Sequence, residues 1–430
     1  MTKQGKPGKT KISISGYQKF VVILLTFFQF TIMLNFMVIS PLGAILLPAL
    51  QITPRQFGLV VSCYALSATV SGILIAGFAD RFERKKLLLF VYGGFLAGTL
   101  LCAFSVNYSL FVVARCITGL FGGVIGAINI SIITDILPIQ SRGSAMGILS
   151  SANPAAMVLG IPIGIFLANK LNWHAPFYLI TIIGLVAGIV MILFMKPVTE
   201  HNKIIKRNNP IAQLLNTVAN PNYMIGFSAL TFITIGAFIL QPFSTVFIVN
   251  NLGVSLNLIP LVFLVSGIVG MVAAPLSGHI ADVVGKYRLF FIANIVSASV
   301  IICYTNLRNS PFWFVLLLNC IIAISISGRM TATMALISTV PAPEDRGSFN
   351  SVTVSIQQLA GAIAAWVAGL VIVQSPTGVI RNMNILGWIV VVALIFSVVM
   401  MARVNNQIKT ADTSKLMAAH MEHEGQETEK

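Results

Sequence analysis

Acidic residues are scarce in this chain, which has 12 Asp and Glu against 27 Lys and Arg in 430 residues. Charged residues make up only 9% of the sequence, whereas 57% is hydrophobic and the mean hydropathy is +0.91. A soluble fold of this length could not bury so much apolar surface. A barrel of membrane strands is excluded as well, because its strands alternate apolar and polar residues and the segments here are continuously apolar. The composition predicts an α-helical protein that crosses a membrane several times.

Groups of residues that carry out catalysis or bind metals are also lacking. No cluster of His, Asp and Glu falls on the apolar segments, and no nucleophile elbow is found. We therefore expect no enzymatic activity, no cofactor and no metal. The cysteines lie in or near apolar segments without ligand spacing, so we interpret them as small packing residues. They are Cys63, Cys102, Cys116, Cys303 and Cys320.

Lysine and arginine are abundant, but their placement argues against a nucleic-acid partner. Of the 27, 21 fall in alternate loops and in the two termini, and two, Arg115 and Arg329, lie inside apolar segments. This asymmetry follows the positive-inside rule, which places both termini in the cytoplasm. We therefore expect membrane lipid, and no nucleic acid, as a partner. The other set of loops holds the remaining four, which are Arg55, Lys170, Arg308 and Arg381.

Twelve apolar segments are each long enough to cross the hydrocarbon of a bilayer, which takes about 17–25 residues. We expect an all-α membrane protein with twelve transmembrane helices in two pseudo-symmetric six-helix bundles. Pro41 and Pro242 mark kinks in the first and seventh helices, because proline removes a backbone donor. The expected spans are 18–46, 56–76, 86–106, 109–134, 144–168, 176–195, 222–249, 257–279, 289–305, 311–338, 348–373 and 382–402.

The longest internal polar stretch, 196–221, divides six segments from six, and we interpret it as a cytoplasmic linker. It separates an N-terminal six-helix bundle, 18–195, from a C-terminal six-helix bundle, 222–402. Residues 1–17 form a cytoplasmic N-terminus. Residues 403–430 form a polar cytoplasmic tail, which we expect to be disordered because its composition is polar and charged.

A short charged stretch that recurs once supports two similar halves. Residues 76–86 carry six charges within the last seven positions, and a degraded copy follows 202 residues later at 278–288. A second pair of loops repeats at the similar offset of 204 residues. Parallel six-helix halves are related in this way in one common transporter architecture. We expect residues of these repeated loops to lie between the two bundles. They are Arg142 and Gly143 of the first loop, with Asp135 just before it, and Arg346 and Gly347 of the second loop.

The charged stretch resembles the loop signature of the major facilitator superfamily, G-x-L-A-D-R-x-G-R-K. It departs from that signature at Ala76 and Glu83, which stand where the family has glycine. The resemblance implies a latch between the halves that holds an outward-open state. The alternative is a loop that only sets orientation in the membrane. The latch residues would be Asp80, Arg81, Arg84 and Lys85 in the first copy, and Gly278, Asp282 and Gly285 in the second.

Two further motifs are similar to elements of the same family, and in particular of its arabinose-efflux-like and drug–proton antiporter branches. Arg115 and Gly119 in the fourth segment match R-x-x-x-G, and the fifth segment contains G-x-P-x-G as Gly160, Pro162 and Gly164. The resemblance implies that the second motif is a bending point for alternating access. The alternative is that its glycines only pack helices closely, as they commonly do in membranes.

The resemblance also implies that the first, fourth, seventh and tenth helices line a central cavity. Arg115 and Arg329 would bind substrate there or assist coupling, because arginine within a bilayer faces a cavity or a partner. The alternative is that each arginine bonds to backbone carbonyls and braces neighbouring helices. Neutral polar residues on these helices would suit a neutral or amphipathic ligand, and hydrogen bonds between helices are an equal alternative. They are Gln29, Asn35, Asn129, Gln241 and Asn319.

No carboxylate lies deep in any apolar segment. Proton-coupled exporters usually need one, and many members of the resembled family carry an Asp in the first helix, where this chain has Asn35. Proton coupling would have to use Asp135, near the inner end of the fourth segment, or the aspartates Asp80 and Asp282 of the charged stretches. Two buried arginines without a buried acid also give a positive field, which favours an anionic substrate.

The sequence as a whole predicts a secondary active transporter that exports a small organic solute, drug-like or sugar-like, by alternating access, with the proton as a candidate coupling ion. One alternative is a facilitator or anion exchanger that uses Arg115 and Arg329. Another is a membrane sensor that does not transport. We expect a monomer in the plasma membrane, which for a bacterium is the inner membrane.

Overall fold

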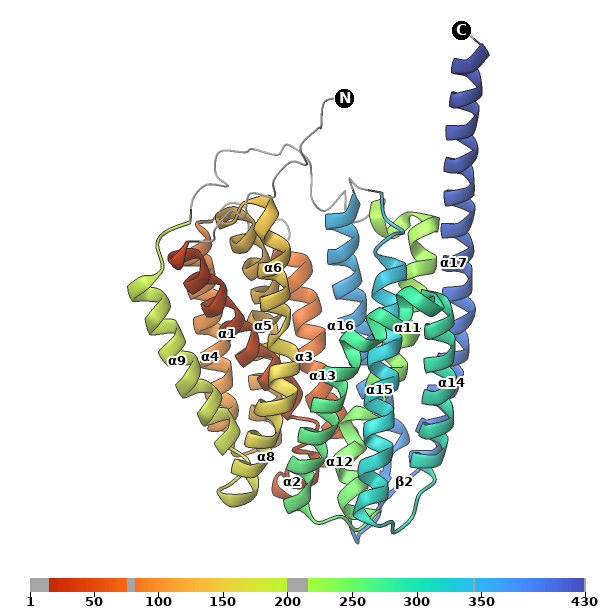
Figure 1. Cartoon of the computed structure of the whole chain (residues 1–430). Coiled ribbons are helices and arrows are strands. Elements are labelled where there is room, and N and C mark those ends of the chain that lie inside the picture. The colour runs from red at the N-terminus through yellow and green to blue at the C-terminus, as the bar shows by residue number, and fades with distance from the viewer. Residues whose placement is uncertain (1–14, 76–81, 199–215, 343–344, 429–430) are drawn as a thin grey trace.

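The structure, a computed structural model of the chain, describes residues 15–75, 82–198, 216–342 and 345–428. These residues are almost wholly helical, which confirms the predicted all-α membrane fold, and they form two groups of helices side by side (Figure 1). The first group, called the N-half below, contains α1 (Gly16–Val38), α2 (Gly43–Ala49), α3 (Pro54–Ile75), α4 (Arg84–Ala103), α5 (Tyr108–Ile136), α6 (Ile139–Ser150), α7 (Ala152–Ala155), the π-helical turn η2 (Ala156–Gly160), α8 (Ile161–Lys170) and α9 (Ala175–Phe194).

The second group, called the C-half, begins after the linker and ends with a long helix that continues beyond the bundle. Between its last two helices a two-residue hairpin pairs β1 (Val373–Gln374) with β2 (Ile380–Arg381). Its helices are α11 (Pro221–Phe238), α12 (Gln241–Asn250), the 3₁₀ turn η4 (Leu256–Leu258), α13 (Ile259–Val284), α14 (Lys286–Thr305), α15 (Phe312–Ile337), α16 (Arg346–Val371) and α17 (Met383–Thr428).

Polar caps begin several of these apolar helices. Ser15 forms a reciprocal capping box with Gln18 at the start of α1, and the Asn107 side chain accepts a hydrogen bond of 2.9 Å from the Leu110 amide in α5. Such caps satisfy the first amides of a helix, which have no partner within it. The chain therefore enters α1 and α5 with part of these donors paired.

Among the predicted spans, the first and the seventh are broken near a proline. The first predicted span, 18–46, ends as a helix at Val38, and the short helix α2 that follows lies at 119° to the first part of α3. Eleven other helical segments among the described residues are long and apolar enough to cross a membrane. The seventh predicted span is divided into α11 and α12. Pro41 and Pro242 lie at these two breaks, because proline cannot donate to the preceding turn.

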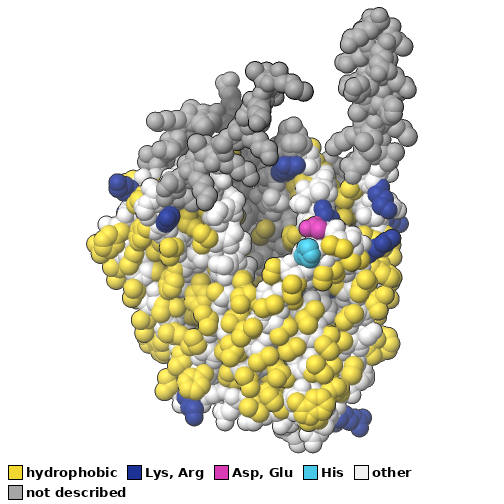
Figure 2. Space-filling model, in the orientation of Figure 1, with side chains coloured by type: hydrophobic (Ala, Val, Ile, Leu, Met, Phe, Trp, Pro, Cys, Tyr) yellow, Lys and Arg dark blue, Asp and Glu magenta, His cyan; other side chains and the backbone are white. Residues whose placement is uncertain are grey.

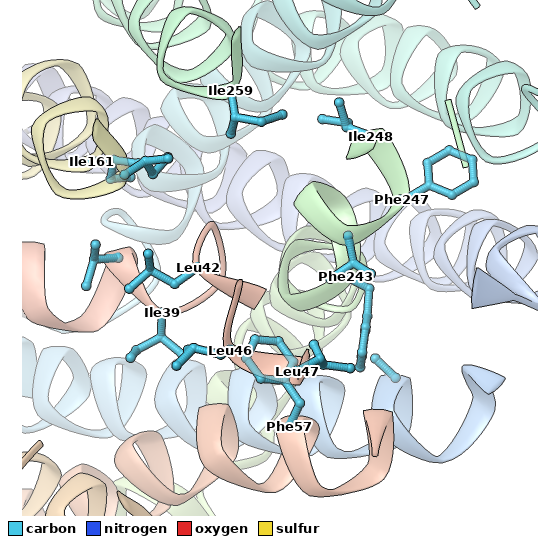
Figure 3. Packing of buried hydrophobic residues seen from close by; sticks show 14 of the residues in the cluster. Ile39, Leu42, Leu46, Leu47, Phe57, Ile161, Phe243, Phe247, Ile248 and Ile259 are labelled. Carbon is cyan, nitrogen blue, oxygen red and sulfur yellow. The ribbon is translucent and has the colours of Figure 1, made fainter. Parts of the chain in front are cut away.

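The two halves share a hydrophobic core at one end of the molecule, called the closed end here. It lies opposite the end at which α1 begins and α17 ends, called the terminal end (Figure 1). At the closed end α2 packs against α12, and α13 packs against η2 and α8. A single hydrophobic cluster there combines both halves, with the rings of Phe57 and Phe243 5.7 Å apart (Figure 3). The Asn169 amide also donates across the halves to the Leu256 carbonyl at 3.1 Å.

A pair of glycines lets the backbones of the two halves touch at the closed end. A Cβ added at Gly58 of α3 would lie 2.8 Å from the Ala365 carbonyl oxygen of α16. One added at Gly369 would lie 2.9 Å from the Pro54 carbonyl oxygen. A side chain at either position would push α3 and α16 apart, because a methyl group cannot approach a carbonyl oxygen so closely.

At the terminal end the two halves have separate cores. One hydrophobic cluster contains residues of α1, α4, α5, α6 and α9, and another contains residues of α11, α14, α15, α16 and α17. Figure 2 shows hydrophobic side chains over the middle of one face, Lys and Arg at its two ends, and a hollow between the halves at the terminal end. The structure is therefore open at the terminal end.

The C-terminal tail differs from the expectation of disorder. α17 continues without interruption from the membrane segment to Thr428. The tail contains several strong helix formers (Ala, Lys, Met, Gln and Glu), and a helix that has already formed adds further residues without a new nucleus. Polar composition alone was therefore a poor guide to its structure.

Candidate functional site

The Arg115 guanidinium lies in the core of the N-half and is fully buried. Its Nη1 donates to the side-chain oxygen of Asn35 at 2.8 Å and to the Asn35 backbone carbonyl at 3.4 Å. Asn35 donates in turn to the Thr99 hydroxyl at 3.1 Å, which itself donates to the Phe95 carbonyl. The structure thus brings together two residues predicted for the site, Arg115 and Asn35, in a network that joins α1, α4 and α5.

Tyr64 of α3 completes this network, although the sequence did not single it out. The Arg115 Cζ lies 4.6 Å from the centre of the Tyr64 ring, which is the geometry of a cation–π contact. Gly119 makes the contact possible, because a Cβ there would lie 2.2 Å from the Tyr64 carbonyl oxygen. The R-x-x-x-G motif therefore places an arginine under an aromatic ring by letting α3 lie against α5. The Arg-x-x-x-Gly motif could have indicated a close helix contact near Arg115. It does not show which helix makes that contact, so Tyr64 could not be predicted.

The C-half holds a neutral counterpart of the Arg115 network. Asn319 of α15 lies 204 residues after Arg115, at the repeat offset of the loops. The buried Tyr304 hydroxyl lies 3.2 Å from the Ser244 hydroxyl and close to the side chain of Asn319, which donates to the Val315 carbonyl at 2.8 Å. Ser244, Tyr304 and Asn319 come from α12, α14 and α15, which correspond to the helices of the N-half network. The two halves therefore share a polar network in which only the N-half carries charge.

Arg329 of α15 is buried like Arg115, with 1% of its surface exposed, but its surroundings differ. Its Nε and Nη1 are both buried without a hydrogen-bond partner in the part of the chain that the structure describes. No described carboxylate pairs with it, since the ion pair found among the described residues joins Arg84 and Asp135. The expectation that Arg329 braces helices through backbone carbonyls has no contact of Nε or Nη1 to support it.

The other neutral polar candidates lie in different environments. Asn129 of α5 donates to Gln29 of α1 at 3.3 Å and to the Leu25 carbonyl at 3.4 Å, so these two predicted residues are also together. Its side-chain oxygen is buried without a hydrogen-bond partner among the described residues. Gln29 is partly exposed, and so is Gln241 at the start of α12, where the seventh span is broken.

The described part of the first charged stretch forms contacts within the N-half. Arg84 Nε donates to Asp135 at 3.3 Å, which joins the start of α4 to the end of α5. The Lys85 ammonium donates to the Ile192 carbonyl at 3.1 Å and to the Met195 carbonyl. The predicted latch residues Asp80 and Arg81 lie outside the described residues.

Glu83, where the family signature has glycine, has a defined role. Its carboxylate caps α4 by accepting from the Lys85 amide at 3.2 Å, and it also accepts from the Val198 amide at 3.1 Å. The Arg84 amide donates back to the Val198 carbonyl at 3.4 Å. The charged stretch is therefore fastened to the chain that leaves α9 toward the linker, most of which (199–215) lies outside the described residues.

The second charged stretch lies at the junction of α13 and α14. Gly285 adopts a φ of +101°, which only glycine takes readily, and this lets the chain turn directly from one helix into the next. Asp282 is exposed in the last turn of α13, and Gly278 lies one turn before it, near Thr331. Among the described residues, no hydrogen bond or ion pair joins Asp282 or Gly278 to the N-half.

The hydrogen bonds of the repeated loops described below are also formed within their own halves. Arg142 of α6 donates to the Thr134 carbonyl at 2.7 Å and to the Leu137 carbonyl at 3.0 Å, so it caps the end of α5. Gly143 has open space around it, as does Gly347 of α16. Arg346 begins α16, after Asp345, which accepts from the Tyr223 hydroxyl at 2.9 Å.

The G-x-P-x-G motif lies at a change of helical pitch. The turn η2, which ends at Gly160, is π-helical, and Pro162 stands in the first turn of α8 directly after it. A π turn accommodates a proline that would otherwise clash with the carbonyl one turn earlier. A Cβ added at Gly160 would lie 2.6 Å from Leu34, and one at Gly164 would lie 2.8 Å from Val38, so both glycines also pack this helix against α1.

The sequence matches a profile of the Major Facilitator Superfamily over residues 25–247 and 226–416. An uncharacterized MFS-type transporter of Bacillus subtilis, YbcL, is 26% identical over 370 residues, which cover 84% of this chain and 90% of the relative. A probable sugar efflux transporter of Mannheimia succiniciproducens is 26% identical over 61% of this chain and 65% of its own length. Multidrug resistance protein 2 of Bacillus subtilis is 24% identical over 75% and 82%.

Solved structures share the same fold. A bacterial homolog of the human lysosomal transporter Spinster, in an inward-facing and unoccupied conformation, superposes with a TM-score of 0.73 at 16% identity, over 91% of this chain and 98% of that one. The nucleoside transporter NupG superposes with a TM-score of 0.72 at 12% identity, over 90% and 99%. The two halves, the charged stretches and the profile match agree: the chain belongs to the Major Facilitator Superfamily and is a secondary transporter, as the motifs predicted.

Proposed function

We propose that this chain exports a small organic solute, sugar-like or drug-like, across the bacterial inner membrane by alternating access. Relatives named for sugar efflux and for multidrug resistance support export and this range of solutes. The observation that carries the proposal is the difference between the two ends. One apolar cluster joins both halves at the closed end, and each half has its own core at the terminal end.

The direction of this opening follows from charge. The bias of Lys and Arg toward one set of loops supports a cytoplasmic location for both termini. The terminal end would then face the cytoplasm, and the structure would represent the inward-open state, ready to receive a solute for export. We further propose that the chain acts as a monomer, because the opening lies between its own two halves.

Coupling to protons, if it drives export, needs a carboxylate that changes partner. Asp135 is the candidate that the contacts support best, because it is partly buried and pairs with Arg84 at the terminal end. Protonation of Asp135 would weaken this pair and loosen α4 from α5. Exchange of anions without protons is a second candidate, and it is favoured by the two buried arginines that lack a carboxylate partner among the described residues.

Efflux from preloaded cells tests the proposal. A bacterial host without its own major exporters is loaded with a fluorescent drug-like dye or a radiolabelled monosaccharide, and loss of solute is followed with and without the protein. We expect faster loss of at least one solute, and we expect this loss to be sensitive to a protonophore. Asp135→Asn should lose active efflux and retain down-gradient exchange.

Equal loss of solute from expressing and empty cells would contradict export. Protonophore-sensitive efflux by Asp135→Asn would exclude Asp135 as the coupling acid.

A further inference from the structure

A layer of buried polar residues crosses the C-half at one depth. On each of four helices, polar side chains stand between residues of the cluster at the closed end and residues of the C-half core at the terminal end. On α15, for example, Leu318 belongs to the first cluster and Ala332 to the second. All members are at most 5% exposed, and they are Thr234 of α11, Asn294 and Ser297 of α14, Ser325 and Arg329 of α15, and Ser397 of α17.

Two close approaches between helices place members of this layer side by side. The Ser397 hydroxyl oxygen lies 3.5 Å from the Asn294 side-chain oxygen, so α17 and α14 meet at this level. A Cβ added at Gly328 would lie 3.6 Å from the Ala293 Cβ, so the residues next to them, Arg329 and Asn294, lie at the same level of α15 and α14. Side chains on a helix lean toward its N-terminus, which directs Arg329 toward the level of Ser325, one turn earlier.

Within this layer, some hydrogen-bond donors are satisfied by their own helices and others are not. Asn294 donates to the Phe290 carbonyl at 2.8 Å, and Ser397 donates to the Leu394 carbonyl at 2.7 Å, so these donors are already used by their own helices. Arg329 Nε and Nη1 and the Ser297 hydroxyl oxygen remain buried without a hydrogen-bond partner among the described residues. The layer therefore carries a full positive charge whose surroundings are only neutral groups.

A charge in this position is costly unless something compensates it. Removing an ion from water destabilises the folded state, and a buried partner must offset that cost. Arg115 is compensated by Asn35 and by the Tyr64 ring, and Arg84 by Asp135, but Arg329 has no such contact from Nε or Nη1. A planar guanidinium with free N–H groups best matches a carboxylate, which can accept two of them at once. The single positive charge of Arg329 would be balanced by a ligand with a single negative charge.

We propose that the polar layer around Arg329 binds the carboxylate of a monoanionic solute. This inference rests on the proposed transport function, and it names the substrate class for that function. Access would run past the end of α11 that approaches the N-half, where the Phe238 ring lies 6.2 Å from Phe36 of α1. Thr234 stands one turn before that end, where the span breaks between α11 and α12. A hinge at this break would expose Arg329 to the space between the halves.

Thermal unfolding of the purified protein tests the site. Sodium acetate, lactate and benzoate are titrated at constant ionic strength, and each is compared with its neutral amide. At least one carboxylate should raise the unfolding temperature of the wild type in a saturable manner, by roughly 2–4 °C, whereas its amide should not. The rise should be lost in Arg329→Met and kept in Arg308→Gln, which removes an exposed arginine from the loop after α14.

Arg329→Met also separates the site from a structural brace. Replacement of an uncompensated buried charge by an apolar side chain of similar length should leave the unfolding temperature without carboxylate equal to or above that of the wild type. A large fall would mean that Arg329 braces the bundle and would overturn the proposal. A carboxylate-dependent rise in Arg329→Met, or none in the wild type, would overturn it as well. If the protein exports neutral solutes but no carboxylate stabilises it, the export proposal holds and the carboxylate site is wrong. If a carboxylate stabilises the protein but no solute is exported, the site holds and the export proposal is wrong.

Discussion

Arg115 and its neighbours show how one residue in the first helix is used. Among the described residues, Asn35 is the only hydrogen-bond acceptor of the Arg115 guanidinium, and its amide also donates to the Thr99 hydroxyl. Arg115 Nε and Nη2 are buried and lack a hydrogen-bond partner in the described ranges. The Asn35 side chain is therefore important for stability, because it provides a hydrogen-bond acceptor for the buried charge of Arg115.

Removal of the Asn35 side chain should destabilise the protein. Asn35→Ala leaves Arg115 Nη1 without its shortest bond, and we expect a loss of about 2–4 kcal/mol, which is the usual cost of a buried charge that loses its partner. Asn35→Asp should keep the unfolding temperature at or above that of the wild type at neutral pH, because the carboxylate pairs with Arg115. Asn306→Ala, at an exposed asparagine after α14, is the control. Equal stability of Asn35→Ala and wild type would show that the bond has no net value.

Gly119 sets how closely α3 approaches α5, and its replacement tests the Tyr64 contact. Because the added Cβ of Gly119→Ala would meet the Tyr64 backbone, we expect a loss of about 3 kcal/mol, at the upper end of the cost of overpacking. Gly147→Ala in α6 is the matched control, since nothing lies within 4 Å of its Cβ, and it should gain about 0.5–1 kcal/mol from helix propensity. Chemical or thermal unfolding of both variants in detergent gives the comparison. Similar changes in both would mean that the two helices separate easily.

At the scale of whole elements, the first charged stretch acts as a joint between α4, α5 and the chain after α9. The family signature has glycine where this chain has Glu83, and that carboxylate accepts from the Lys85 and Val198 amides. The ammonium of Lys85 donates to carbonyls at the end of α9. The departure from the signature therefore adds a link between the start of α4 and the start of the linker.

Loss of this link should be visible at single amides. Glu83→Ala removes the acceptor of both the Lys85 and the Val198 amide, and loss of such a cap costs about 1 kcal/mol. Hydrogen exchange at both amides should then be about fivefold faster, because 1 kcal/mol corresponds to that factor. Lys86→Ala changes an exposed neighbour in the same turn and serves as the control. Unchanged exchange at Val198 in Glu83→Ala would show that the link does not hold the end of α9.

The elements differ in how far the sequence alone could predict them. The helical spans follow from hydropathy, and the two halves follow from the repeat offsets, because both signals are carried by the residues themselves. The π turn before Pro162, the separate short helix after Val38 and the role of Tyr64 were missed. Each depends on which faces of two helices meet, which periodicity cannot reveal. The same reason explains why Arg329 could be named as buried but not placed in a polar layer.

At the scale of the whole molecule, the main feature is the asymmetry between the two ends. Apolar side chains of both halves interlock at the closed end, and the glycines Gly58 and Gly369 bring two backbones into contact there. The contacts between the halves are mostly apolar and lie opposite the open terminal end. Such a closure can open without breaking ion pairs, and its strength depends on how closely the packed surfaces fit. Alternating access then requires these surfaces to separate in every cycle.

A disulfide across the closed end should stop this cycle. A Cβ added at Gly43 of α2 would lie 3.1 Å from a methyl group of Val246 in α12, which brings the two positions within reach of a disulfide. In a background without the five native cysteines, Gly43→Cys with Val246→Cys should lose efflux after oxidation and regain it after reduction. Each single cysteine should be unaffected by oxidant, which separates the cross-link from damage caused by the substitutions. Full efflux by the oxidised double variant, with the cross-link verified by mass spectrometry, would mean that α2 and α12 stay together throughout transport and that the closed end opens elsewhere.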